Sequence, residues 1–214
     1  MKKIKQNQKM NQEEVWNALA EQWYHFRQRP FRDVASEIEK LSRKLAKGKI
    51  LDIGCGNCRN LLPFSKKGFE CYGIDFSSGM LKFAKHYCKK YGFKVKLKKA
   101  RAEKLPFKSN SFDYVLNIAT LHHLKKPEQE KAVKEMYRVL KPHRIAFITV
   151  WNKFPLSLFI KNRYEKWTKK GQAYYRYYYL FTPWELKSLL KKHGFEIIKS
   201  TCKKNIIFIV RKIL

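Results

Sequence analysis

The residues whose spacing most clearly predicts chemistry are two aspartates and a glycine-containing turn. Gly54 and Gly56 follow Asp52 where a buried strand should turn into a helix, and small residues there let the backbone approach a ligand. Asp75 ends the next expected strand, about 20 positions further on, where a carboxylate can accept hydrogen bonds from both ribose hydroxyls of an adenosine cofactor. Because the turn lacks a third glycine, a pyrophosphate site is disfavoured. The alternative is that both aspartates only cap strand ends.

Cysteine spacing offers a second candidate for chemistry. Cys55 and Cys58 have the spacing of a metal or redox motif, but no second ligand pair follows and both lie on the same turn. The chain has 5 cysteines, an odd number, largely in expected core elements. We therefore predict free thiols, packing roles for Cys55 and Cys58, and no metal site.

A segment rich in rings and cations lies between residues 151 and 184. Twelve aromatic residues and seven Lys or Arg residues are interleaved there. Such interleaving suits unpaired bases, which stack on rings while cations follow the phosphate backbone. The alternative is a lid whose aromatic side chains simply pack on the sheet.

The elements that must position these residues alternate as strands and helices. Strands are expected at 49–53, 70–74, 93–97, 112–118 and 145–150, with helices at 57–67, 78–91 and 127–140 between them. Helical spacing also marks 15–26 and 34–45, and a capping box at Thr182 begins a helix that Gly194 ends, before two strands around 196–199 and 206–210. This order predicts an α/β, Rossmann-like fold with a mostly parallel seven-stranded sheet and helices on both faces.

The length and composition predict a single domain, because 214 residues with 44% hydrophobic content can bury one sizeable core. Within it we expect a basic flexible tail (1–10), N-terminal helices (11–47), a cofactor-binding core (48–150), an aromatic and basic substrate lid (151–184), and a C-terminal helix with strands (185–214). No apolar stretch approaches the roughly 18 residues that cross a bilayer, and the first ten residues lack the apolar part of a signal peptide. We therefore expect a soluble cytoplasmic protein with no membrane partner.

The charge balance is the most unusual property of the composition. Forty-eight Lys and Arg residues face 17 Asp and Glu residues, which gives a net charge of +31. Such a charge predicts a polyanionic partner, and nucleic acid would bind with release of counterions. The alternative is a general enrichment in lysine, with most lysines merely solvated.

Five strings resemble the class I S-adenosylmethionine-dependent methyltransferases, in order and over about half of the chain. They are LDIGCGN, YGIDFSSGML, AEKLPF, SFDYVLNIATLHHL and MYRVLKPHRIAFITV. The resemblance implies S-adenosyl-L-methionine as cofactor, with its methionine part at Asp52 and Gly54 and its ribose at Asp75. It places the adenine edge at Ala102 and Glu103. The complete implied cofactor site is Asp52, Gly54, Cys55, Gly56, Asp75, Phe76, Met80, Ala102, Glu103, Asn117, Ile118 and Ala119.

Two positions depart from the pattern of that family. Arg101 stands where the family often has an acidic residue that binds adenine. His143 and Arg144 replace the usual pair of glycines after Lys-Pro. The first departure bears directly on how adenine is recognised.

A narrower resemblance is to the tRNA wobble-uridine carboxymethyl methyltransferases of eukaryotes and archaea, over residues 15 to 200. It is similar in VWNALAEQWYHFRQRPF, in the pair His122 and His123, in Val150-Trp151 and in RYYYLF. This family resemblance implies methyl esterification of a carboxymethyl group on the wobble uridine of a tRNA anticodon stem-loop. Tyr179 occupies a position where that family usually has histidine.

A carboxylate acceptor would suit these residues. With a pKa near ~4 it is ionised at neutral pH and can attack a sulfonium methyl group without a general base, so placement becomes the main task. An arginine can orient a carboxylate through two hydrogen bonds, and Arg27 is the candidate, with His122 and His123 lining the pocket. A surface cation is the alternative for Arg27, and a packing role for His122. The predicted substrate-binding residues are Arg27, Trp151, Arg176, Tyr178 and Tyr179.

The tRNA family usually works with a small zinc-binding activator protein that covers an edge strand of the sheet, so the resemblance implies such a partner. The expected edge strand, Lys94-Val95-Lys96-Leu97-Lys98, carries lysines that commonly discourage strand addition.

Three other functions stay open. One is methylation of a small molecule, with the aromatic segment enclosing an apolar acceptor. Another is methylation of RNA at a different site. The third is a non-catalytic RNA-binding protein that keeps the fold, with Arg101 as a sign of cofactor loss.

Overall fold

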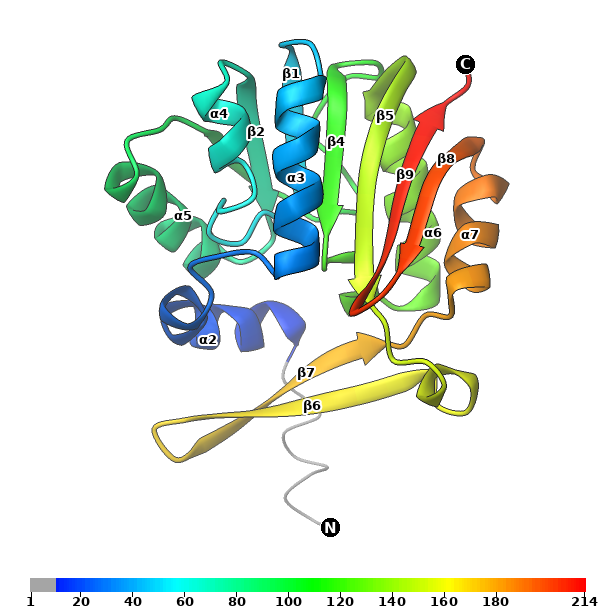
Figure 1. The fold of residues 1–214 in the computed structure, drawn as a ribbon. Helices are drawn as coiled ribbons and strands as arrows, with labels where there is room; N and C mark the ends of the chain where they lie inside the picture. The colour runs from blue at the N-terminus through cyan, green and yellow to red at the C-terminus, as the bar shows by residue number, and fades with distance from the viewer. Residues whose placement is uncertain (1–10) are drawn as a thin grey trace.

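The computed structural model describes residues 11–214, and the predicted tail at 1–10 lies outside the described residues. A seven-stranded sheet has the order β3-β2-β1-β4-β5-β9-β8 (Figure 1). Strands β3, β2, β1, β4 and β5 run parallel to one another, while β9 is antiparallel to both of its neighbours, β5 and β8. The strands are β1 (Lys49–Ile53), β2 (Glu70–Asp75), β3 (Lys96–Lys99), β4 (Phe112–Ile118), β5 (Leu140–Trp151), β8 (Phe195–Cys202) and β9 (Asn205–Lys212). The predicted Rossmann-like fold with a mostly parallel seven-stranded sheet is confirmed.

Helices cover both faces of the sheet, which explains why the central strands are apolar throughout. On one face, the core of β1, β4 and β5 packs against α6 and α7. On the other, it packs against α3, α4 and α5. The helices are α2 (Gln12–Phe26), α3 (Arg32–Lys44), α4 (Leu62–Lys66), α5 (Ser78–Lys90), α6 (Lys126–Val139) and α7 (Pro183–Lys192), with 3-10 turns η1 (Leu121–His123) and η2 (Leu156–Leu158).

Two predicted elements differ from the structure. The helix expected at 57–67 is reduced to α4, because Gly56 and Cys58 adopt left-handed backbone angles with φ of 53° and 64°, which a helix cannot include. The strand expected at 93–97 is displaced to β3, where it pairs only with β2 and forms an edge of the sheet. The other predicted elements occur within a few residues of their expected bounds.

The aromatic segment at 151–184 contains a β-hairpin that the sequence patterns did not predict. Strands β6 (Asn162–Lys169) and β7 (Gln172–Tyr179) form a separate antiparallel sheet. Lys170 and Gly171 join them with φ of 48° and 76°, the left-handed pair of a tight two-residue hairpin turn. The hairpin and α2 lie beyond the carboxyl ends of the parallel strands (Figure 1).

Side chains of α2 tie this layer to the rest of the fold. Gln12 bonds to the hairpin: its Nε2 donates to the Tyr175 carbonyl at 3.2 Å, and its Oε1 accepts from the Tyr177 amide at 2.9 Å. Asn17 Oδ1 accepts from the Gly79 amide at 2.9 Å and from the Ser77 hydroxyl at 2.7 Å, at the start of α5. The position of α2 between sheet and hairpin is therefore fixed from both sides.

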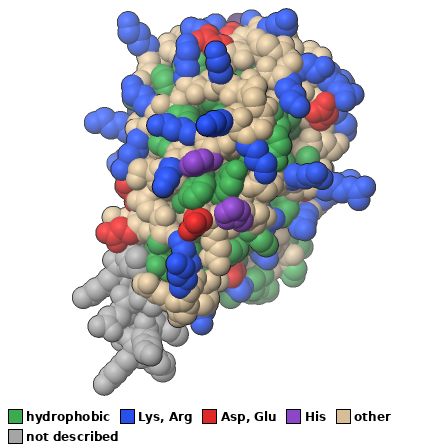
Figure 2. All heavy atoms as spheres, turned by 90° about the vertical axis from the view of Figure 1, so that its left-hand side faces the viewer, with side chains coloured by type: hydrophobic (Ala, Val, Ile, Leu, Met, Phe, Trp, Pro, Cys, Tyr) green, Lys and Arg blue, Asp and Glu red, His purple; other side chains and the backbone are tan. Residues whose placement is uncertain are grey.

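Basic side chains dominate the surface. Figure 2 shows Lys and Arg side chains spread over the face at the α5 side, with few Asp or Glu among them and apolar side chains exposed between them. No helix among residues 11–214 has the length and apolar character to cross a bilayer.

Candidate active site

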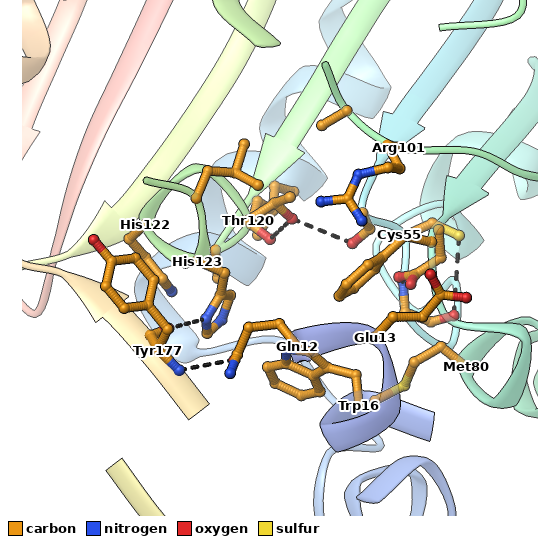
Figure 3. Close-up of a pocket in the computed structure, with 18 of the residues that line it drawn as sticks. Gln12, Glu13, Trp16, Cys55, Met80, Arg101, Thr120, His122, His123 and Tyr177 are labelled. Carbon is orange, nitrogen blue, oxygen red and sulfur yellow. Dashed lines mark hydrogen bonds between the residues drawn. The ribbon is translucent and has the colours of Figure 1, made fainter. Parts of the chain in front are cut away.

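A cavity of about 560 Å³ lies where the carboxyl ends of the strands meet α2 and the hairpin, the position at which open α/β sheets bind ligands (Figure 3). Loops after β1, β2 and β4 supply one side of its wall, and α2 and β7 supply the other. Its size is typical of a small-molecule site. Fourteen predicted site residues line it: Gly54, Cys55, Gly56, Asp75, Phe76, Met80, Ala102, Glu103, Ile118, Ala119, His122, His123, Trp151 and Tyr178.

The two glycines of the turn after β1 serve different purposes. Gly54 has φ of 72°, and a Cβ there would lie 2.2 Å from Thr120 Oγ1, so only glycine fits. Gly56 has φ of 53°, but a Cβ there would meet nothing closer than Arg59 Nη1 at 4.0 Å. The absent side chain of Gly56 therefore leaves open space on the cavity side, in which a ligand can approach the backbone.

Asp75 is held at the end of β2 with both oxygens oriented. Its Oδ2 accepts from the Gly56 amide at 3.0 Å and its Oδ1 from the Ser77 amide at 2.9 Å. Burial raises the pKa of Asp75 to about 6, against the lowering effect of these hydrogen bonds. Each oxygen keeps a further lone pair, so the carboxylate can still accept a bond from a ligand hydroxyl.

Asp52 and Asn117 lie beneath the cavity rather than in its wall. Both are fully buried, and Asp52 Oδ1 and Asn117 Nδ2 have no hydrogen-bond partner in the protein. Asn60 Nδ2 donates to Asp52 Oδ2 at 3.5 Å. Burial raises the pKa of Asp52 to about 7. Unpaired buried polar groups are rare, and these two sit where a polar ligand would lie above them.

Arg101 is fixed at one rim of the cavity by carboxylates. Its Nε donates to Glu103 Oε1 at 2.8 Å, and its Nη2 lies 3.8 Å from Glu128 Oε1. Its guanidinium is 5.7 Å from the ring centre of Phe76. Glu103 and Glu128 thus place acidic groups beside Arg101, and all three residues line the cavity.

The two histidines are buried, and backbone bonds fix their tautomers. His122 Nδ1 accepts from the Trp151 amide at 3.1 Å, so its proton is on Nε2. His123 Nδ1 lies 2.9 Å from the Tyr177 carbonyl, which can only accept, so His123 is protonated at Nδ1 (Figure 3). Burial lowers the pKa of His122 well below its usual value and that of His123 to about 3. Both rings are therefore neutral at physiological pH.

Aromatic rings enclose the histidines. Trp151 stacks on Tyr178 with ring centres 4.4 Å apart, and His122 stacks on the same tyrosine at 5.2 Å. Trp16 of α2 meets His123 edge-on at 5.0 Å. This end of the cavity is a largely apolar pocket in which a ligand would be screened from water.

Three predicted substrate residues do not line the cavity. Arg27 packs behind Phe31, with its guanidinium 4.3 Å from the ring centre. Arg176 is buried behind Tyr178, whose hydroxyl accepts from its Nη1 at 2.8 Å. Tyr179 points away and donates to Glu185 Oε1 at 3.2 Å.

Several lining residues were not predicted from the sequence, among them Trp16, Arg59, Thr120, Tyr164 and Tyr177. Trp16 belongs to the helical apolar stripe of α2, which predicts a buried face without indicating what it covers. Thr120 immediately follows the predicted wall residues of β4, so the signal was present there. Tyr164 and Tyr177 lie in the aromatic segment predicted as a substrate lid, but its pattern did not single out these two rings. For Arg59 no local sequence signal identifies a role in the site.

Comparison with known proteins shows the family. A model of the methyltransferase domain matches residues 50–143. An uncharacterized protein of Methanocaldococcus jannaschii is 35% identical over 166 residues, covering 78% of this chain and 73% of that protein. A ubiquinone biosynthesis O-methyltransferase of Dinoroseobacter shibae is 32% identical over 165 residues, 75% of this chain and 63% of the relative, so the chain spans less than two thirds of that protein's length.

A solved S-adenosylmethionine-dependent methyltransferase from Methanosarcina mazei is 25% identical, with a TM-score of 0.70 over 82% of this chain and 97% of that one. These relatives support the methyltransferase class. They do not support the narrower resemblance to the tRNA wobble-uridine enzymes.

The cavity fits the cofactor of this class. The open side of Gly56 admits a ligand to the backbone, and the oriented oxygens of Asp75 suit ribose hydroxyls. Fold, cavity and relatives agree that this chain belongs to the class I S-adenosylmethionine-dependent methyltransferases.

Proposed function

We propose that the chain methylates a carboxylate oxygen of a small-molecule acceptor and so forms a methyl ester. S-adenosylmethionine supplies an electrophilic methyl group. The observation that supports a carboxylate acceptor is the state of His122 and His123, two of the titratable side chains that line the cavity. Neither is a base of useful strength.

A hydroxyl acceptor would need a proton removed. A phenol with a pKa of ~10 gives up its proton poorly to an imidazole whose pKa is lowered to about 3, as that of His123 is. His122 has its one basic nitrogen, Nδ1, engaged by the Trp151 amide. A carboxylate with a pKa of ~4 is already ionised at pH 7 and needs no base.

The residues of the pocket would instead place and desolvate the acceptor. The Nε2–H group of His122 is the donor that this ring can offer to a carboxylate oxygen. The stacked rings of Trp151 and Tyr178 would hold an acceptor against them and exclude water, which leaves the carboxylate more reactive. Placement of this kind can supply ~7 to 11 kcal/mol of a barrier.

The relatives favour a small molecule over tRNA as acceptor. The Dinoroseobacter relative is named a ubiquinone biosynthesis O-methyltransferase, and ubiquinone is a small molecule. The aromatic end of the cavity suits a compound with a ring next to its carboxyl group.

A second candidate is the carboxymethyl group on the wobble uridine of a tRNA anticodon stem-loop. The net charge of +31 favours it, since a polyanion would be attracted to the basic surface. The same carboxylate chemistry would apply. In this case the partners would be tRNA and a small zinc-binding activator at the exposed edge strand β3.

The test is transfer of label from S-adenosylmethionine to a panel of acceptors. The panel holds aromatic carboxylic acids, the matched phenols and amides, and anticodon stem-loops with and without carboxymethyluridine, each with and without the candidate activator. Base-labile label in the acids supports the small-molecule proposal. Label only in the carboxymethylated RNA supports the second candidate, and label only in phenols contradicts both.

A further inference from the structure

We propose that Arg59, backed by Arg27 and Arg176, forms a carboxylate-binding subsite at the wall of the cavity. Two ligands would bring a carboxylate to this subsite: the acceptor, and the methionine part of the cofactor. The inference rests on the proposed function only for the acceptor.

Arg59 reaches the cavity from the turn after β1. Its Nη1 donates to Asn57 Oδ1 at 3.0 Å, and its Nε is buried without a partner. The same Nη1 is the atom nearest to the open side of Gly56. A guanidinium has five N–H donors, so the bond to Asn57 leaves further N–H groups of Arg59 for a carboxylate in the cavity.

Asn57 joins Arg59 to Arg27. Its Nδ2 donates to the Arg27 carbonyl at 2.9 Å, while its Oδ1 holds Arg59. The Arg27 guanidinium lies over the rings of Phe26 and Phe31, at 4.5 and 4.3 Å from their centres, and its Nε is also buried without a partner. Rings on both sides would hold this cation in place while leaving its charge uncompensated.

Arg176 adds a third cation to the group, beside Trp23. Arg27 and Arg176 lie 5.5 and 5.3 Å from the centre of that indole ring. The two arginines are close enough for Arg176 to lower the pKa of Arg27, and Arg27 in turn lowers that of Arg59. Trp23 thus lies beside the guanidinium groups of Arg27 and Arg176. Asn57 bonds both the guanidinium of Arg59 and the backbone carbonyl of Arg27.

No ion pair compensates these three arginines within residues 11–214, whereas Arg43, Arg101 and Arg138 each have a carboxylate partner. The carboxylate of Asp52 acts electrostatically on Arg59, yet no ion pair joins the two side chains within the described residues. Arg176 is buried and the other two arginines are half-buried, and a site that gathers partly desolvated cations without ion-pair partners is complementary to an anionic ligand. Arg59 is the member of the group that lines the cavity, so it would make the direct contact.

The experiment compares Arg59→Gln and Arg59→Lys with the surface control Arg43→Gln. The first arm measures binding of S-adenosylhomocysteine, which has the methionine-derived carboxylate, and of 5′-methylthioadenosine, which lacks it. If the cofactor fills the subsite, Arg59→Gln weakens S-adenosylhomocysteine about ten- to hundredfold and leaves methylthioadenosine unchanged. Arg59→Lys keeps the charge, so its affinity for S-adenosylhomocysteine should lie between those of the wild type and of Arg59→Gln. This variant guards against the case in which Arg59→Gln fails to fold.

The second arm saturates the protein with S-adenosylhomocysteine and compares phenylacetate with phenylacetamide. If the acceptor fills the subsite, the wild type prefers the acid and Arg59→Gln removes that preference. The proposal is overturned if Arg59→Gln leaves S-adenosylhomocysteine affinity unchanged and removes no preference for the acid. Because the first arm involves no methyl transfer, weakened S-adenosylhomocysteine binding without any ester product would leave the subsite standing and reject the proposed function.

Discussion

The ionisation of Asp75 should make cofactor binding depend on pH. Its pKa is raised to about 6 by burial, so it is ionised above that pH and protonated below it. The ionised form accepts hydrogen bonds from ribose hydroxyls better than the acid does. We predict that the Kd for S-adenosylhomocysteine is level between pH 7 and 8 and rises about tenfold per pH unit below 6, as measured by calorimetry. In Asp75→Asn this dependence should be lost, and a level Kd in the wild type down to pH 5 would contradict the role of Asp75.

Asp52 should make the cofactor-free protein less stable at high pH. Its pKa rises from 3.8 to about 7 on folding, so the unfolded chain loses the proton first and stability falls as pH rises through that window. We predict that Asp52→Asn raises the Tm at pH 8 and gives no gain below pH 4. Asp113 has a lowered pKa because Lys141 and the Lys49 amide bind it, so Asp113→Asn should lower the Tm at pH 8. Scanning calorimetry at pH 8 measures both changes in Tm, which should be an increase for Asp52→Asn and a decrease for Asp113→Asn.

His122 is positioned to orient an acceptor rather than to remove a proton. We predict that His122→Ala lowers turnover at least about tenfold and leaves cofactor affinity unchanged, because its ring packs on Tyr178 at the acceptor end. Initial rates with an accepted substrate, together with calorimetry of S-adenosylhomocysteine, measure both quantities. Unchanged turnover would remove His122 from the site.

The residues near the cofactor could be predicted because the backbone places them. Gly54, Gly56 and Asp75 follow strand ends directly, so sequence order fixes their position in the site. The arginines could not be predicted in the same way. The direction of a long side chain depends on which rings it meets, and Phe31 and Tyr178 stand between the cavity and Arg27 and Arg176.

At the scale of elements, several side chains of α2 contact the hairpin, among them Gln22, which bonds Trp167, and Gln12, which bonds the β7 backbone. Gln12 bonds the β7 backbone with both its amide nitrogen and its oxygen, as a neighbouring strand would. We predict that Gln12→Ala lowers the free energy of unfolding by ~1 to 3 kcal/mol, since it leaves the Tyr177 amide unpaired. Hydrogen exchange should show faster exchange of that amide. Gln28→Ala, which removes only a bond within its own segment to Tyr24, is the control.

The hairpin escaped prediction because its strands lack the usual alternation. In NRYEKWTK and QAYYRYYY, polar and aromatic residues occupy both faces, and β7 is buried at nearly every position from Tyr174 to Tyr179. The core strands were predictable because helices on both faces require continuous apolar runs. The shortened α4 has a different cause, since the left-handed angle of Cys58 is imposed by the cofactor turn.

Across the whole molecule, the net charge of +31 opposes compactness. Repulsion between exposed lysines is screened by salt, while the core is little affected. We therefore predict that the Tm rises as NaCl is increased from about 50 to about 500 mM. Scanning fluorimetry at pH 7 measures it, and neutral sucrose at matched osmolality is the control. A Tm that falls with added salt would show that surface ion pairs outweigh repulsion.

The global architecture was the most predictable feature. Alternating strands and helices allow few sheet orders, because parallel crossovers are right-handed. Whether the lysines bind a polyanion could not be predicted from composition, because the same lysines would also serve solubility.

The buried carboxyl group of Asp52, whose Oδ1 has no hydrogen-bond partner, has a consequence for how long the protein lasts in a cell. The cofactor-free form holds polar groups that the protein alone does not satisfy, and a ligand at 100 times its Kd stabilises the folded state by about 2.7 kcal/mol. Proteases act on chains that open. The abundance of this protein should therefore follow the combined supply of S-adenosylmethionine and S-adenosylhomocysteine, so that starvation for methionine removes the enzyme as well as its cofactor.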